Sequence, residues 1–156
     1  MLNITGLAHK YQVDPLLAKC KSVLEDLLDD CYEKAGAGYN LKQLPYLLIC
    51  FKILNIALLY DFTEICTKGK NVISKFPCLY FIITREGFSN AVKQKWIDQD
   101  RYNRLRNQSE FNVDKEFDAV FKQQDACVNL FRSLPWEIQR FILVKRLVLC
   151  DDQTRK

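Results

Sequence analysis

Four prolines mark the boundaries of helical segments in this chain, and they constrain its fold more than any other feature. Pro15 and Pro45 each open a run of apolar residues spaced three and four apart. Proline is favoured in the first turn of a helix because its missing N–H has no helical partner there. Pro77 ends one such segment, and Pro135 breaks the chain and restarts it. Because almost no stretch alternates apolar and polar residues as a strand does, we predict an all-α fold of stacked helical hairpins.

The predicted helices follow one another with short connections. They cover residues 3–13, 45–60, 63–76, 89–106, 114–131 and 136–148, together with a helix that begins at residue 14 and ends at Gly36 or Gly38. At residues 78–84 a short helix is favoured over a strand. A length of 156 residues allows one sizeable core, so we predict a single domain. Within it, residues 1–76 form two helix-turn-helix units, residues 77–150 add further hairpins on the same core, and residues 151–156 form a frayed tail.

Charge and cysteine content narrow the class of protein. The net charge of +4 and the pI of about 8.6 are lower than dedicated nucleic-acid-binding domains usually have. Seven cysteines, none in a CxxC pair, predict a reducing compartment, and without a recognisable signal peptide we expect a cytoplasmic or nuclear protein. The most apolar stretch, residues 44–60, contains Lys52, so we predict a buried helix there and no membrane span.

The sequence contains a weak internal repeat. A shift of 49 residues places residues 7–13 on 56–62, and places Lys19, Lys21 and Val23 on Lys68, Lys70 and Val72. Ala8 thereby coincides with Ala57, and a small residue at this point permits close helix packing. Tyr11 coincides with Tyr60, and we expect each of these aromatic rings to plug the turn of its helix-turn-helix unit. Two copies predict hairpins that each bury an apolar side against the next.

The repeated part resembles a known family. The first copy, with LAHKYQV at residues 7–13 and LLAKC at 16–20, resembles the last helix pair of BTB/POZ domains. The second copy is similar to the helical extension that follows a BTB domain in proteins combining MATH and BTB domains. The resemblance covers residues 2–76 and implies a protein-interaction role in a substrate adaptor of a cullin-type ubiquitin ligase, with a cullin or a ubiquitination substrate as partner. It implies no catalytic residue and no cofactor, so we do not expect an enzyme.

One departure from the family limits what this resemblance implies. In BTB proteins a strand-and-helix core precedes this helix pair and carries the dimer interface and most of the cullin contacts. The present sequence starts after that core, so none of its residues inherits those contacts. We therefore expect the back part of a longer protein, a truncated form or a divergent relative.

Candidate chemical sites are few. His9 is the only histidine, which excludes a histidine-rich zinc site and an HExxH protease. A dyad of His9 and Cys20 would in principle give a thiolate nucleophile, but we favour an exposed polar histidine. The scattered cysteines are interpreted as core residues rather than zinc ligands. Glu25 and Asp29, four apart on one helix face, are interpreted as a solvated charged surface, with an acidic docking surface as the alternative.

Large aromatic residues beside polar helices are the candidate partner contacts. Residues 93–106 combine five basic residues with Trp96 and Tyr102, a pattern that also suits phosphate contact and base stacking. Asp98 and Asp100 reduce the positive field, so we prefer local ion pairs and keep weak RNA binding as the alternative function. Residues 134–143 resemble the opening of an F-box, although we favour a proline-started helix there. The predicted protein-binding residues are Trp96, Tyr102, Trp136 and Phe141.

Overall fold

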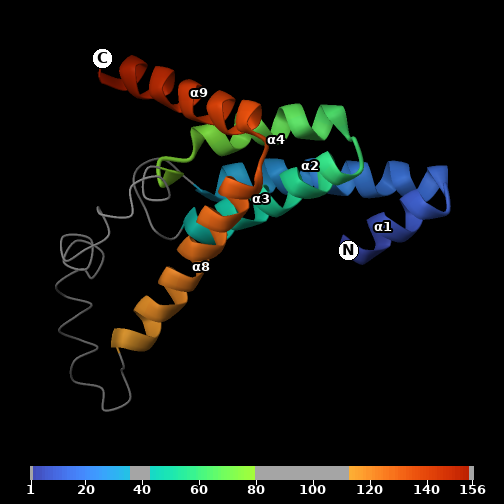
Figure 1. Cartoon of the computed structure of the whole chain (residues 1–156), viewed down its shortest axis with the longest axis horizontal. Helices are drawn as coiled ribbons and strands as arrows, with labels where there is room; N and C mark the ends of the chain where they lie inside the picture. Colours follow the sequence, from blue (N-terminus) through green and yellow to red (C-terminus); the bar gives the residue numbers. More distant parts are fainter. Residues whose placement is uncertain (1, 36–42, 80–112, 155–156) are drawn as a thin grey trace.

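The computed structural model describes residues 2–35, 43–79 and 113–154, which form six α-helices (Figure 1). The helices are α1 (Leu2–Lys10), α2 (Asp14–Ala35), α3 (Leu44–Leu59), α4 (Thr63–Lys75), α8 (Val113–Ser133) and α9 (Trp136–Thr154). These three ranges contain no strand, so the predicted all-α class is confirmed for them. The helix predicted at 89–106 and most of the one at 78–84 lie outside the described residues.

The prolines lie at helix boundaries, as predicted. Pro15 is in the first turn of α2, and Pro45 is in the first turn of α3. Pro77 follows the end of α4, and Pro135 separates α8 from α9. The helix α9 is longer than predicted, because residues 151–154, which we expected in a frayed tail, are helical. Neither glycine nor proline occurs in the sequence after the last of these prolines, so no helix-stopping residue ends α9 earlier.

The helix α3 is the centre of the core and contacts α2, α4 and α8. Its Phe51 ring meets the Phe131 ring of α8 edge-on, with the ring centres 6.0 Å apart. The buried residues of α3 are Leu44, Leu47, Cys50, Phe51, Ile53, Leu54 and Ala57, whereas Lys52 is exposed. The buried helix predicted for this stretch is therefore confirmed. Among the helices of the described residues, none combines the length and apolarity that crossing a membrane requires.

A tight turn with a defined hydrogen-bond pattern joins α1 to α2. The N–H of Val13 donates to the carbonyl of Ala8 (3.0 Å), and the N–H of Gln12 donates to the carbonyl of His9 (3.3 Å). Gln12 has a φ of 51°, in the left-handed region. These features define a Schellman motif, which satisfies the last carbonyl groups of a helix and redirects the chain.

The turn between α3 and α4 has the same pattern 49 residues later. The N–H of Phe62 donates to the carbonyl of Ala57 (2.8 Å), and the N–H of Asp61 donates to the carbonyl of Leu58 (3.4 Å). Asp61 has a φ of 56°. The sequence repeat therefore corresponds to a repeat of backbone structure. We refer to α1–α2 as unit 1 and to α3–α4 as unit 2.

The tyrosines at the two turns have different surroundings. The Tyr60 ring centre lies 4.9 Å from that of His9 in α1. Its hydroxyl lies so close to Gly6 that a Cβ atom there would be 2.7 Å from Tyr60 Oη. Tyr11, by contrast, is 66% exposed. The prediction that an aromatic ring plugs each turn is wrong for Tyr11, because no described helix packs against that side of unit 1.

Candidate functional site

The outer side of α9 carries a stripe of exposed apolar side chains, which we call the α9 face. Its members are Trp136, Phe141, Val144, Leu147 and Val148, with exposed fractions from 38 to 66%. The opposite side of the helix packs on the core, where Ile142 is completely buried. The helix α9 is therefore apolar on two sides, and only one of them is covered within the described residues.

Hydrogen bonds hold α9 in place at both its start and its middle. The Gln139 side chain donates to the carbonyls of Leu134 (2.7 Å) and Arg132 (3.3 Å), which fixes the connection from α8. The buried Arg146 guanidinium donates to the carbonyl of Lys75 (3.3 Å), the last residue of α4. A cation at a helix C-terminus is favoured because the unsatisfied carbonyl groups there carry partial negative charge. The α9 face is thus presented by a helix with a fixed position.

One edge of the α9 face is basic. The ammonium groups of Lys70, from α4, and Lys145 lie 4.9 and 5.6 Å from the centre of the Phe141 ring. The Lys145 ammonium also donates to the side-chain oxygen of Asn71 in α4. These cations lie where charged groups of a bound molecule would meet the rim of the apolar stripe.

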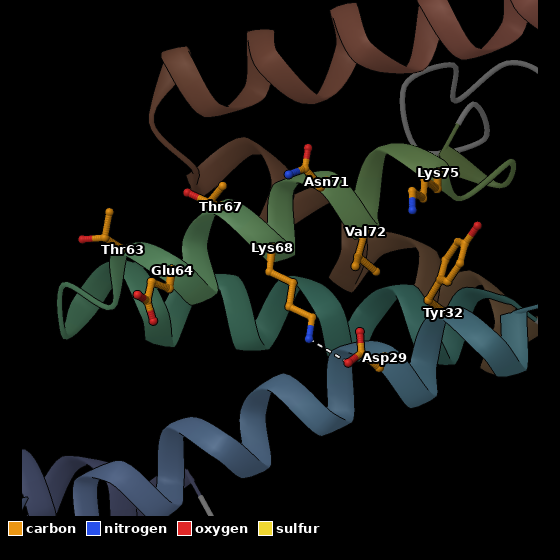
Figure 2. A pocket seen from close by; sticks show the side chains of 9 residues that line it. All are labelled: Asp29, Tyr32, Thr63, Glu64, Thr67, Lys68, Asn71, Val72 and Lys75. Carbon is orange, nitrogen blue, oxygen red and sulfur yellow. Dashed lines mark hydrogen bonds and ion pairs between the residues drawn. The ribbon is translucent and has the colours of Figure 1, made fainter.

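A second feature is a groove of about 590 Å³ between α2 and α4 (Figure 2). Its walls are formed by Asp29, Tyr32, Thr63, Glu64, Thr67, Lys68, Asn71, Val72 and Lys75. An ion pair between Lys68 Nζ and Asp29 Oδ2 (2.7 Å) crosses it, as Figure 2 shows. Lys75 Nζ lies 4.5 Å from the centre of the Tyr32 ring. Because these charged groups bind each other across the groove, we assign it to the packing of α4 on α2.

The acidic residues near the end of α2 are partly neutralised. Besides the ion pair of Asp29, Asp30 Oδ2 pairs with Lys34 Nζ at 2.7 Å. The hydrogen bond that the Lys34 ammonium donates to the Asp30 carboxylate raises the pKa of Lys34. This arrangement agrees with the solvated charged surface expected for Glu25 and Asp29 more than with an acidic docking surface.

Five of the seven cysteines are buried, which confirms their interpretation as core residues. They are Cys20, Cys31, Cys50, Cys78 and Cys127, while Cys66 and Cys150 are half-buried. A hydrogen bond with Cys31, together with burial, raises the pKa of the Cys50 thiol. Burial also raises the pKa of both Cys78 and Cys127 to about 12. The thiols of Cys50, Cys78 and Cys127 are therefore neutral at physiological pH. Among the described residues, no three His, Cys, Asp or Glu side chains converge as metal ligands would.

The candidate dyad of His9 and Cys20 is not assembled. His9 is exposed and its ring contacts Tyr60, whereas Cys20 is buried. In the described part of the chain no interaction joins these two side chains. The interpretation of His9 as an exposed polar residue is confirmed.

The structure places two of the four predicted partner contacts. Trp136 and Phe141 lie on the α9 face, while Trp96 and Tyr102, with the basic stretch at 93–106, lie outside the described residues. Val144, Leu147 and Val148 are exposed on the same face, although the helix predicted at 136–148 did not distinguish them from core residues such as Ile142. A helix that packs on one interface needs only one apolar side, yet apolar residues occur on both sides of this helix. This excess is the sequence signal that could have separated the exposed residues from the core residues.

Comparison with known proteins finds no matching family model, no matching curated protein and no matching solved structure. The resemblance to BTB proteins therefore stays a prediction.

Proposed function

We propose that this chain is a protein-interaction module that binds a partner protein through the α9 face. The observation that supports this function is the exposure of five large apolar side chains on a helix whose other side is anchored to the core. Burial of apolar surface stabilises a protein or a complex by roughly 25 cal/mol per Å². Contiguous exposed apolar patches are therefore typical of interaction sites. Tryptophan is enriched among the residues that dominate binding energy, which favours Trp136 as an anchor.

The chemistry of the α9 face fits an amphipathic helix with acidic residues along one edge. The stripe from Trp136 to Val148 extends about 18 Å along the helix axis at 1.5 Å per residue. A partner helix of similar length would bury its apolar side chains along this stripe. Its carboxylates would lie next to Lys70 and Lys145, which steers association and sets the direction of the bound helix.

The proposal is tested by placing charge on the α9 face. We expect Val144→Asp combined with Leu147→Asp to weaken partner binding by roughly tenfold or more, because a buried unpaired carboxylate is costly. Lys122→Asp on α8 is the matched control, since it alters the net charge by the same amount at an exposed position away from this face. Partners captured from cells are quantified by mass spectrometry, purified partner is titrated by calorimetry, and circular dichroism verifies the folding of each variant.

Two outcomes decide the proposal. A partner lost by the α9 variant and retained by the Lys122→Asp control supports it, and a cullin among such partners supports the ligase-adaptor role that the BTB resemblance implies. If the native chain and the α9 variant bind all partners equally, the proposal is wrong.

A further inference from the structure

The 49-residue offset relates an exposed apolar surface of unit 1 to a buried surface of unit 2. Ile4, Leu7, Val13 and Leu16 correspond to Ile53, Ile56, Phe62 and Ile65. The four residues of unit 1 are 40 to 55% exposed. Of their counterparts, three are buried, and the fourth, Ile56, packs against the core. Similar side chains at the same repeat positions thus have opposite environments. We call Ile4, Leu7, Tyr11, Val13 and Leu16 the open face.

Unit 1 provides part of the cover over the equivalent surface of unit 2. The Tyr60 ring packs on α1 at Gly6 and His9. From α2, the ammonium of Lys21 lies 4.8 Å from the centre of the Phe62 ring. The helix α2 also contacts both α3 and α4. Within residues 2–35, 43–79 and 113–154, no element covers the open face of unit 1 in the same way.

We propose that the open face binds a helical hairpin of a partner protein, packed on unit 1 as unit 1 packs on unit 2. The open face continues the interface between the two units in the same repeat register. The partner hairpin would present a glycine to the Tyr11 ring, as Gly6 is presented to Tyr60. Repeated helical units bury their apolar sides on their neighbours, and a unit without a neighbour leaves such a side exposed.

A partner protein fits the open face better than a second copy of this chain does. The small residue that a second copy would offer is Gly6, and its own Tyr60 already occupies the space above that glycine. The open face is also separate from the α9 face. Figure 1 shows α1 near one end of the long axis of the molecule and the C-terminal end of α9 near the other. The proposal therefore does not depend on the function proposed for α9.

The probe for this surface is a fluorescently labelled peptide with the sequence of residues 1–35, titrated into the full-length chain. This peptide has the apolar side and the glycine that pack on unit 2. In the peptide, Tyr11→Ser and Leu16→Ser prevent it from binding a further copy of itself. We expect saturable binding by fluorescence anisotropy, weakened roughly tenfold or more by Leu7→Asp in the full-length chain. Lys19→Ala is the matched control, since it alters the net charge equally at an exposed position of α2.

A second change tests the small residue itself. Gly6→Leu in the peptide should weaken binding by a similar factor, because the added side chain would meet the Tyr11 ring. Equal affinity of the peptide for the native chain and for the Leu7→Asp chain would mean that the peptide displaces unit 1 from unit 2. In that case the proposal is wrong. No saturable binding at millimolar peptide also contradicts it. Self-association of the full-length chain that Leu7→Asp abolishes would assign the face to a second copy and overturn the proposal.

Discussion

The turns at residues 11–13 and 60–62 share one backbone structure and differ in what packs on them. Both place a tyrosine at the helix end, a residue with positive φ after it, and an apolar residue next. At the second turn, Phe62 is buried and Tyr60 packs on α1, whereas at the first turn Tyr11 and Val13 are exposed. Local sequence therefore determines the turn, while burial of its side chains depends on a neighbouring unit.

The largest contrast between the units is expected at Ile65 and Leu16, which occupy the same repeat position. Ile65→Ala should lower the free energy of unfolding by about 3 kcal/mol, because it leaves a cavity among buried side chains. Leu16→Ala should lower it by roughly 0.5 kcal/mol, because this side chain remains in contact with water. Urea unfolding followed by circular dichroism measures both values. Equal losses would show that the two units are equally well packed.

Thiol labelling compares the local stability of the two units. Cys20 in unit 1 and Cys50 in unit 2 are both buried. Because one side of unit 1 is uncovered, we expect it to open more easily, so that Cys20 is alkylated roughly tenfold or more faster than Cys50 in the native protein. Mass spectrometry of labelled peptides measures the rates, with Cys127 as a buried reference on α8. Equal rates at Cys20 and Cys50 would mean that the units open together.

The contact between Gly6 and Tyr60 provides a smaller test. Gly6→Ala should gain about 1 kcal/mol from helix propensity, but in the native chain the added methyl group meets the Tyr60 hydroxyl. In a Tyr60→Phe background that hydroxyl is absent, so Gly6→Ala should stabilise the protein by about 0.5 kcal/mol more than it does in the native background. Thermal unfolding of the four proteins of this double-mutant cycle measures the difference. A coupling energy of zero would show that the side chain at position 6 and the Tyr60 hydroxyl do not interact.

The smallest effects are expected at the residues with positive φ. Gln12→Gly and Asp61→Gly should each raise the free energy of unfolding by roughly 0.5 kcal/mol, because glycine adopts the left-handed conformation without a Cβ clash. The gain should be larger at Gln12, since aspartate tolerates this region better than glutamine. Chemical unfolding of the two variants provides the comparison. A loss of stability at either position would show that the added freedom of glycine in the unfolded chain outweighs the strain it relieves in that turn.

Helices and turns were predictable because their signals are local. Pro45 in the first turn of α3 and Pro135 before α9 act within a few residues, and the offset that aligns Tyr11 with Tyr60 is visible by comparing the sequence with itself. The end of α9 was misplaced because polar residues after Cys150 were interpreted as a tail, although they do not prevent helical hydrogen bonding.

Packing between distant segments was not predictable in the same way. The ion pair of Asp29 with Lys68 joins residues 39 positions apart, so helical spacing gives no sign of it. Val144 and Ile142 are both apolar and lie on one helix, yet only Ile142 faces the core. Which apolar side of a helix is covered depends on how α4 and α9 meet, and that arrangement is a property of the whole fold.

The close approach of Gly6 to the Tyr60 hydroxyl makes two distant positions depend on each other. Among related sequences we expect them to covary: phenylalanine at position 60 should accompany alanine at position 6, and tyrosine at 60 should accompany glycine at 6. Position 11 is under no such constraint within the described chain. We expect tyrosine to be conserved at position 11 in lineages whose open face binds a partner. In lineages whose open face stays exposed to solvent, we expect free substitution at this position.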